Sequence, residues 1–401
     1  MGDRADGRQA CRARSRSVRI LFSSTRGVGH VRPLLPYARA LRERGHEILV
    51  AGPADLGETL ARAQLPHALL DHPGDAGLTP LWTRLRAAPA EERSDFIVRH
   101  IFAGVVAQTA LPRLRETIEA FRPAVIVRES FEFAAAVAAD AARIPHARVA
   151  VHSAASEAPT RTAAAEAIAP LRARTGLPDG GDAWRRAEPV FTWFPPSLDG
   201  PAGIDGEQAP FHVRTQVDAP ASAAAPAWDR SGEPGPLVYV TFGTVTSTIE
   251  EARAIYRVAL DALADAPVRA LLTTGPGVER DALGPVPGNV HVEAWVPQGE
   301  ALARARAVIC HGGSGTVIGA LAAARPLVVV PLFADQPENA RRIAALGAGI
   351  DLPAPTPGGL RAAIARVIDD PDLHAGAARL GAEIAGLRPL DAAVDALLEL
   401  A

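Results

Sequence analysis

The sequence predicts an α/β protein of two successive domains, each built on a parallel sheet covered by helices. Its 401 residues exceed what one ordinary hydrophobic core organises. Short apolar runs alternate with helix-like segments, which is typical of parallel sheets with helical crossovers. This alternation weakens once, in a long stretch rich in Ala, Pro, Ser and Gly, and then restarts.

The first alternation begins near Val18. A strand is expected over 18–24, a turn over 25–33, a helix over 34–44 and a second strand over 46–52. Leu34, Leu35, Ala38 and Leu41 share one face of that helix. Further on, strands are expected at 123–127 and 146–152, with an alanine-rich helix at 133–142 between them.

The second alternation predicts strands at 237–242, 270–274, 289–295, 307–311, 326–331 and 348–352. We therefore divide the chain into a disordered tail (1–17), a first domain (18–215), a linker (216–235), a second domain (236–375) and a C-terminal segment (376–401). Two doubly wound domains in succession place a ligand cleft between the carboxyl ends of their strands.

Composition excludes several classes of function. A net charge of -3 gives no electrostatic reason to expect nucleic acid or an anionic membrane as partner. Two cysteines, Cys11 and Cys310, provide no disulfide framework or thiolate metal site, which fits a reducing cytoplasm. We expect no transmembrane helix, because no apolar run approaches the roughly 20 residues that one needs. The arginine-containing start has no apolar core, so we expect no secretory signal there.

A glycine-rich turn, His311-Gly-Gly-Ser-Gly315, joins an expected strand to an expected helix. Free N–H groups and the positive helix end at such a turn favour a phosphate group. It is neither of the common nucleotide motifs: the chain has no lysine for a Walker A loop, and the glycine spacing differs from G-x-G-x-x-G. Arg32 likewise breaks that fingerprint in the upstream GVGHVR. A tight turn without a ligand is the alternative.

Residues 295–340, with W-x-P-Q, H-G-G-x-G-T and P-x-x-x-D-Q in this order, closely resemble the donor-binding segment of the family 1 nucleotide-sugar glycosyltransferases. The opening SSTRGVGHVRPLLPYARAL resembles the G-H-x-x-P element of the same family. RESFEFAA is similar to its antibiotic-tailoring members, including enediyne and macrolide enzymes. The resemblance implies a GT-B fold: two Rossmann-like domains, the first holding the acceptor and the second the nucleotide sugar. It also implies that the last helix, 387–400, crosses back to the first domain.

The resemblance also implies the roles of particular residues. Trp295 would stack on the nucleobase, with Val296 and Gln298 beside it. The diphosphate would be held by His311, Thr316 and the turn at Gly313, Ser314 and Gly315, with His311 contributing positive potential, and Thr244 and Gly29 would line the same donor site. Asp335 and Gln336 would bind sugar hydroxyls, although Asp335 is also placed to cap the following helix.

His30 is implied as the general base, a role suited to a side chain that titrates near neutrality. Family members commonly place an aspartate behind this histidine, where this chain has Glu129, one methylene longer. Glu132 is a second candidate partner, and both can instead be ordinary loop carboxylates.

The implied reaction is an inverting, metal-independent transfer of a sugar, with no cofactor, to a hydroxyl of a hydrophobic natural product. The acidic residues Asp370 and Asp372 follow a helix and are expected to be surface carboxylates. Many relatives that use uridine diphosphate sugars have a glutamate three residues after the phosphate-binding Thr316, where this chain has Gly319. The loss of that ribose contact favours a thymidine diphosphate (dTDP) donor carrying a deoxysugar.

Two other functions fit the fold class: a nucleotide-sugar epimerase and a non-catalytic nucleotide-binding partner. The apolar, proline-rich 153–230 segment favours an acceptor pocket over the first. His30, Thr316, Asp335 and Gln336 favour catalysis over the second. The sequence is compatible with a homodimer, and it identifies neither the acceptor nor any need for an activator protein.

Overall fold

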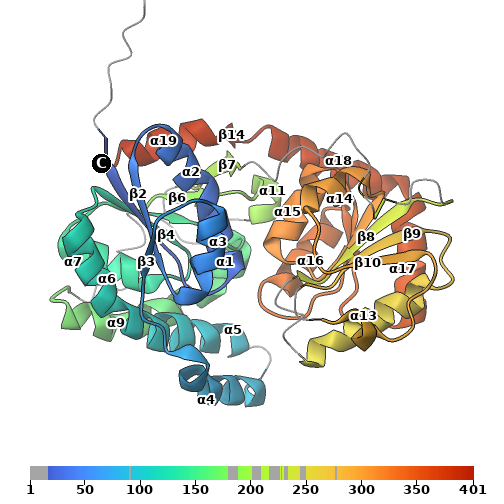
Figure 1. Cartoon of the computed structure of the whole chain (residues 1–401), viewed down its shortest axis with the longest axis horizontal. Helices are drawn as coiled ribbons and strands as arrows, with labels where there is room; N and C mark the ends of the chain where they lie inside the picture. Colours follow the sequence, from blue (N-terminus) through green and yellow to red (C-terminus); the bar gives the residue numbers. More distant parts are fainter. Residues whose placement is uncertain are drawn as a thin grey trace, which may run out of the picture.

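A computed structural model describes residues 17–89, 92–178, 188–200, 209–215, 226, 228–229, 234–243, 250–275 and 278–401. Residues 1–16 of the expected tail, most of the expected linker and Thr244 lie outside the described residues. Two α/β halves lie side by side, which confirms the predicted fold class (Figure 1).

The first half contains a parallel sheet with strand order β14-β7-β6-β5-β4-β1-β2-β3. Its strands are β1 (Arg19–Ser23), β2 (Glu47–Gly52), β3 (His67–Leu69), β4 (Val125–Glu129), β5 (His146–Val149), β6 (Val190–Thr192), β7 (Phe211–Arg214) and β14 (Arg388–Pro389). The register aligns Leu21 of β1 with Leu49 on one side and Ile126 on the other. Continuous apolar runs form these strands because the sheet is covered on both faces.

Helices cover both faces of the first sheet. The helices of this half are α1 (Val28–Val31), α2 (Leu35–Glu43), α3 (Gly57–Arg62), α4 (Gly74–Ala87), α5 (Arg93–Phe96), α6 (Ala107–Phe121), α7 (Phe133–Ala142), α8 (Ala154–Glu157) and α9 (Arg161–Arg174). The short helix α11 (Pro196–Asp199) follows them and packs against the second half. One core lies under α6, α7 and α9, and the other lies under α2 and α3. A π-helical segment, Ile97–Val106, joins α5 to α6.

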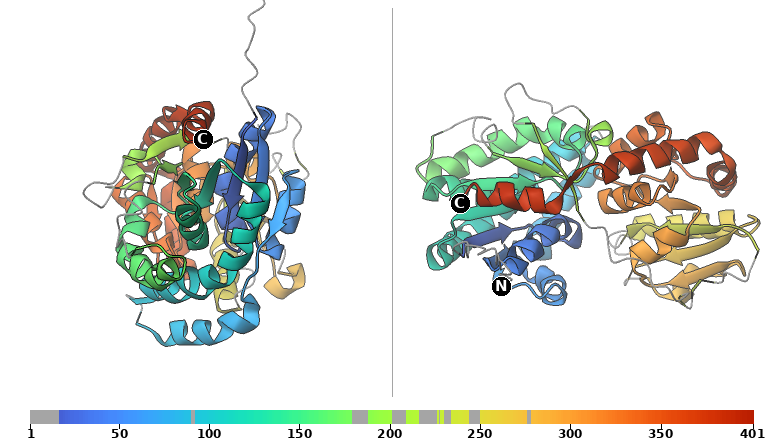
Figure 2. Two further views of the ribbon diagram at one scale, coloured as in Figure 1. Left: turned by 90° about the vertical axis from the view of Figure 1, so that its left-hand side faces the viewer. Right: turned by 90° about the horizontal axis from the view of Figure 1, so that it is seen from above.

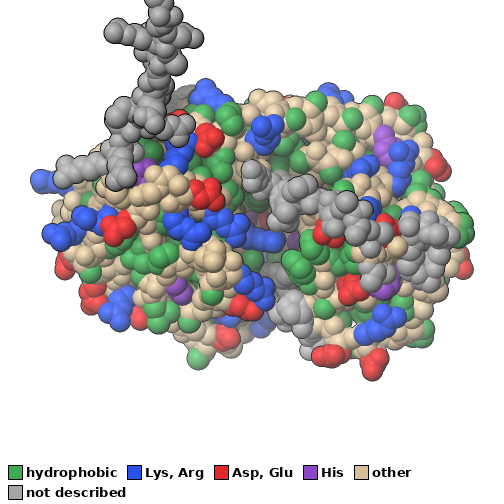
Figure 3. Space-filling model, turned by 45° about the horizontal axis from the view of Figure 1, so that its top comes forward, with side chains coloured by type: hydrophobic (Ala, Val, Ile, Leu, Met, Phe, Trp, Pro, Cys, Tyr) green, Lys and Arg blue, Asp and Glu red, His purple; other side chains and the backbone are tan. Residues whose placement is uncertain are grey.

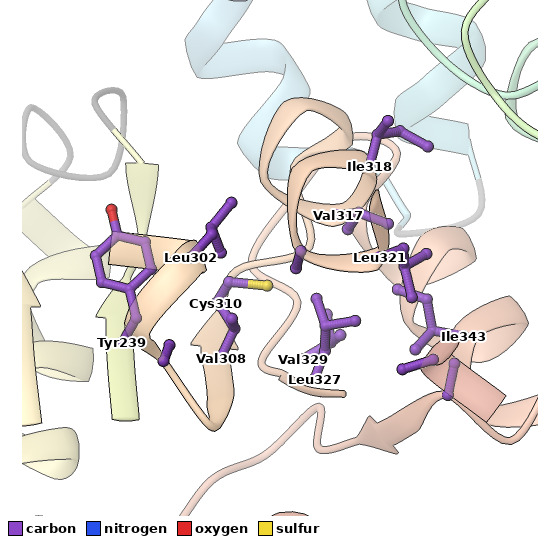
Figure 4. Packing of buried hydrophobic residues seen from close by; sticks show 14 of the residues in the cluster. Tyr239, Leu302, Val308, Cys310, Val317, Ile318, Leu321, Leu327, Val329 and Ile343 are labelled. Atoms are coloured by element: carbon purple, nitrogen blue, oxygen red, sulfur yellow. The ribbon is translucent and has the colours of Figure 1, made fainter. Parts of the chain in front are cut away.

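The second half contains a parallel sheet with strand order β10-β9-β8-β11-β12-β13. Its strands are β8 (Leu237–Thr241), β9 (Arg269–Thr273), β10 (Val290–Glu293), β11 (Ala307–Cys310), β12 (Leu327–Val329) and β13 (Gly349–Asp351). Its helices are α13 (Glu250–Leu263), α14 (Gln298–Arg304), α15 (Ser314–Ala322), α16 (Gln336–Ala345), α17 (Pro357–Asp369) and α18 (Pro371–Ala385). Figure 4 shows Val317 and Leu321 of α15 packed over Val308, Cys310 and Leu327 of the central strands.

The end of the chain returns to the first half. Position 376, where we divided the chain, lies inside α18, which packs against α15 of the second half. The return occurs at β14, which pairs with β7, and the following helix α19 (Leu390–Leu398) packs on α2 (Figure 2). Arg44 at the end of α2 forms ion pairs with Asp391 and Asp395 of α19.

The carboxyl ends of the parallel strands face the boundary between the halves, where the segments after β5 and β6 contact the segments after β12 and β11. A hollow lies between the halves on the face in Figure 3. The loops that follow β1, β4 and β5 therefore approach those that follow β11 and β12. Within the residues that the structure describes, no helix is both long enough and apolar enough to span a membrane.

We expect Gly381→Ala to lower the stability of the second half. A Cβ added at Gly381 of α18 would lie 2.7 Å from the carbonyl oxygen of Leu321 in α15, so the two helices must separate. Such overpacking typically costs about 1–3 kcal/mol. Gly358→Ala in α17 is the matched control, because its Cβ meets no atom within 4 Å. Urea denaturation should show a lower midpoint for the first variant only; equal midpoints would contradict the close packing.

Candidate active site

His30 and Glu129 meet at the carboxyl ends of two neighbouring strands. His30 lies in the short helix α1 after β1, and Glu129 is the last residue of β4. Nδ1 of His30 is 3.2 Å from Oε2 of Glu129, an ion-pair separation in which the ring is not aligned for an ideal hydrogen bond. Since Nδ1 faces the carboxylate, Nε2 is the ring nitrogen left for a substrate.

The Glu129 carboxylate is fixed by three further donors. Thr25 donates to Oε1 from its backbone N–H (3.2 Å) and its hydroxyl (2.8 Å), and the backbone N–H of Phe131 donates to Oε2 (2.7 Å). Burial by itself would raise the pKa of Glu129, but His30 and these donors hold it below its usual range. Burial by itself would lower the pKa of His30, yet the Glu129 carboxylate raises it above its usual value.

Glu132, the other candidate partner, has a different position. Its Oε2 accepts from the backbone N–H of Ala135, so it caps the start of α7. Burial, and then the nearby charge of Glu129, raise the pKa of Glu132 to about 7. The structure therefore places Glu129, and not Glu132, against His30.

The glycine turn between β11 and α15 serves the protein's own packing as well as any ligand. Gly312 has φ 90°, and a Cβ there would lie 3.2 Å from the backbone oxygen of Gln336. A Cβ at Gly313 would lie 2.5 Å from Nε2 of His311. Among the described residues, no side chain caps α15, whose first residues Ser314 and Gly315 follow this turn. Its N-terminal N–H groups thus remain suited to an anion.

His311 lacks the positive charge that we expected of it. Burial lowers the pKa of His311 to about 4, although Asp335 opposes that effect. Its Nδ1 is a buried atom without a hydrogen-bond partner in the described structure. At neutral pH the ring is therefore uncharged, and the expectation of positive potential from it is wrong for the free protein. It offers a ring N–H donor instead.

Asp335 and Gln336 lie at the start of α16, next to the glycine turn. Oδ2 of Asp335 accepts from the hydroxyl of Ser314 (2.6 Å) and from Nδ2 of Asn339 (2.8 Å). Asp335 is the N-cap residue of α16, as the capping alternative expected, but its side chain makes no capping hydrogen bond to this helix. Oε1 of Gln336 accepts from the backbone N–H groups of Leu332 and Phe333.

Of the remaining expected donor residues, Gln298, Thr316 and Trp295 belong to the second half, and Gly29 lies in α1 of the first half. Nε2 of Gln298 donates to the hydroxyl of Thr316 (3.1 Å), which ties α14 to α15. Trp295, just after β10, is 63% exposed, whereas Val296 beside it is buried. The indole of Trp295 is therefore free to stack on a flat ligand. Gly29 has open space around its Cβ position.

Two residues that we did not single out reach across the boundary. His152, just after β5, has Nε2 3.6 Å from Oδ1 of Asp335. Trp193, just after β6, lies 3.7 Å from the Cβ position of Gly315. Both follow strands of the first sheet at its carboxyl edge, and this position is the signal that could have identified them.

No group of three or more His, Cys, Asp or Glu side chains that could hold a metal ion occurs in the described part of the chain. Asp370 accepts from the backbone N–H of Asp372 and so caps α18. Cys310 is a free buried thiol, and burial raises its pKa to about 12. It is therefore unsuited to act as a nucleophile at neutral pH.

Comparison with known proteins connects this site to a chemistry. Residues 257–400 match the family model described as "Erythromycin biosynthesis protein CIII-like, C-terminal domain". The chain is 30% identical to the L-demethylnoviosyl transferase of Streptomyces niveus, over 84% of this chain and 86% of that protein. It is 31% identical to the elloramycin glycosyltransferase of Streptomyces olivaceus, over 84% and 87% of the two chains. Among solved structures, it is similar to the spinosyn rhamnosyltransferase SpnG complexed with thymidine diphosphate, with a TM-score of 0.78, 27% identity and coverage of 95% and 100%.

We expect the neutral state of His311 to make the folded protein sensitive to acid. With a folded pKa of about 4 and an ordinary value near 6.5, the unfolded chain binds a proton between these pH values that the folded chain does not. This residue therefore lowers stability as pH falls from 6.5, by up to about 1.4 kcal/mol per pH unit. Urea denaturation from pH 7 to pH 4.5 should show a smaller loss for His311→Asn than for the unsubstituted protein. Parallel pH curves for the two proteins would contradict the buried neutral ring.

Proposed function

This chain belongs to the family 1 nucleotide-sugar glycosyltransferases of the antibiotic-tailoring type, and on that premise we propose that it transfers a deoxysugar from dTDP to a hydroxyl of a hydrophobic natural product. The observation that carries the proposal is the pairing of His30 with the buried carboxylate of Glu129 beside the donor-binding edge of the second half. The charge of Asp335 in the second half also raises the pKa of His30 in the first half. The two side chains therefore interact electrostatically across the boundary between the halves.

In the proposed reaction, Nε2 of His30 accepts the proton of the acceptor hydroxyl. The acceptor oxygen then forms a bond to the anomeric carbon of the sugar while the bond from that carbon to the diphosphate oxygen breaks. The bonding electron pair leaves with the dTDP, and the configuration at the anomeric carbon inverts because a single displacement occurs. Glu129 stabilises the imidazolium of His30 that forms, as a fixed carboxylate behind a catalytic histidine does.

We assign the stabilisation of the charge on the departing diphosphate to the start of α15. The uncapped N-terminal N–H groups of this helix and its dipole favour an anion, and the hydroxyl of Thr316 and a ring N–H of neutral His311 add donors without a full positive charge. In this proposal no metal ion is needed for the departure.

The choice of dTDP rests on two observations. Gly319 lies one turn after Thr316 in α15 and brings no carboxylate to that turn, so a ribose 2′-hydroxyl loses a charge-assisted acceptor. A deoxyribose has no such hydroxyl to satisfy. The second observation is that the similar SpnG structure is complexed with thymidine diphosphate.

The first prediction of this function concerns the base. His30→Ala should lower turnover by about 10²–10⁴-fold with little change in dTDP affinity, because the base acts only in the transition state. Turnover is measured with a dTDP-sugar and an aglycone that the unsubstituted enzyme accepts in a mass-spectrometric screen. Near-normal turnover of the variant would exclude His30 as base.

The companion measurement is the pH profile of kcat/KM. Activity should fall as pH decreases through the pKa of His30, which Glu129 raises. Glu129→Gln removes that carboxylate, so the acidic limb of the profile should move to lower pH and the maximal rate should fall. Glu132→Gln, in the same turn, is the matched control and should leave the limb in place. If only Glu132→Gln shifts the acidic limb of the profile, Glu132 and not Glu129 is the carboxylate that pairs with His30.

A second prediction concerns the nucleotide. Isothermal titration calorimetry should show tighter binding of dTDP than of UDP, because the 2′-hydroxyl of UDP loses a partner near Gly319. Trp295→Ala should weaken dTDP and thymidine by the same factor, on the order of 10-fold for one stacked base. Tighter UDP binding would refute the assignment of dTDP, while leaving the tests of His30 unaffected.

A further inference from the structure

The two oxygens of the Asp335 carboxylate have different surroundings. Oδ2 is saturated by Ser314 and Asn339, which are both buried. Oδ1 accepts no hydrogen bond from the described residues and faces His152 of the first half, whose Nε2 is 3.6 Å away. Asp335 is thus held rigidly by one oxygen while the other points across the domain boundary.

His152 is held in place by its neighbours. Its ring packs on Phe131 with a centroid distance of 5.0 Å, and its backbone N–H donates to Glu157. Phe131 also packs against His30, with a centroid distance of 5.8 Å. The side chain of His152 remains 23% exposed, and its Nε2 is directed at Asp335 across the boundary. The pair of His152 and Asp335 therefore lies next to the proposed base, where the transferred sugar must lie.

The separation within this pair suits a hydroxyl group. At 3.6 Å the two polar atoms are too far apart for a good hydrogen bond to each other. A hydroxyl beside them can donate to Oδ1 and accept from Nε2–H at the same time, because it is both donor and acceptor. A hydrogen bond to a charged carboxylate is stronger than a neutral one. A hydrogen atom in place of the hydroxyl offers neither contact.

We propose that His152 and Asp335 together bind one hydroxyl of the transferred sugar, so that the first half completes the donor site and selects sugars with a hydroxyl at that carbon. The inference rests on the proposed function, since it requires a nucleotide-sugar donor. It assigns to His152 a direct contact with substrate.

The test compares two ligands that differ only by the sugar: dTDP and dTDP-glucose, by isothermal titration calorimetry. His152→Phe keeps an aromatic ring to pack on Phe131 and removes the ring N–H. The dissociation constant for dTDP-glucose should rise about 10-fold, as expected for the loss of one hydrogen bond, and that for dTDP should stay unchanged. His152→Gln, which restores an N–H donor, should recover part of the loss.

His100→Phe is the matched control. His100 also packs on a phenylalanine, Phe96, at a centroid distance of 4.5 Å. This variant should bind both ligands as the unsubstituted protein does. In a double-mutant cycle with Asp335→Asn, the losses for dTDP-glucose should be less than additive, because either substitution removes the shared hydroxyl contact.

Three outcomes would overturn the proposal: unchanged dTDP-glucose binding in His152→Phe, an equal loss for both ligands, or additive losses in the cycle. The second would assign to His152 only a role in the fold. A wrong assignment of dTDP as donor would give a different result from these three, because the unsubstituted protein would then bind UDP more tightly than dTDP. The same comparison then uses UDP and UDP-glucose, with the same expected changes.

Discussion

The turn that carries Glu129 depends on a buried ion pair between Arg128 and Glu188. The guanidinium donates to both carboxylate oxygens, at 2.7 and 2.6 Å, and its Nη1 donates to the backbone carbonyls of Glu129 and Ser130. Neither side chain of the pair is exposed. An isolated buried charge would be very costly, so this pairing stabilises both side chains, and the two bonds from Nη1 hold the backbone of the turn after β4. The buried Arg128–Glu188 pair therefore helps to fix the position of the Glu129 carboxylate that faces His30.

This ion pair belongs to a larger network under β4, β5 and β6. Nδ1 of His146 lies 2.9 Å from Glu188 and Nε2 lies 3.1 Å from Asp140. Burial alone would lower the pKa of His146, but these two carboxylates raise it to about 9. Ser130 donates to Glu157, which also pairs with Arg148. Strands that are neighbours in the sheet are thus joined by ionic contacts as well as by the backbone ladder. The loops that they position form the edge of the first half that faces the cleft.

The junction between the halves is built from short polar contacts and one small helix. Arg342 of α16 donates to the carbonyl oxygens of Ser197 and Leu198 in α11 (2.7 and 2.6 Å). A cation is favourable there because the C-terminal end of a helix carries partial negative charge. Leu198 is buried in the apolar core of the second half, although it precedes the second sheet in the chain. Trp193 and His152 approach the second half from the same side. Residues from both halves therefore border the edge of the second half to which we assign the donor. A nucleotide sugar bound there would contact both halves.

The sequence by itself determined the two parallel sheets, because alternating apolar and helix-like runs with glycine turns allow few other arrangements. It also placed His30, Glu129, His311 and Asp335 at strand ends, because local motifs record positions along the chain. Only the tertiary structure decided between Glu129 and Glu132, which lie three residues apart in one turn and differ in the direction of their side chains. It also decided the neutral state of His311, since a pKa depends on burial by residues distant in sequence. The approach of His152 to Asp335 joins residues 183 positions apart in separate halves, and no local pattern encodes such a contact.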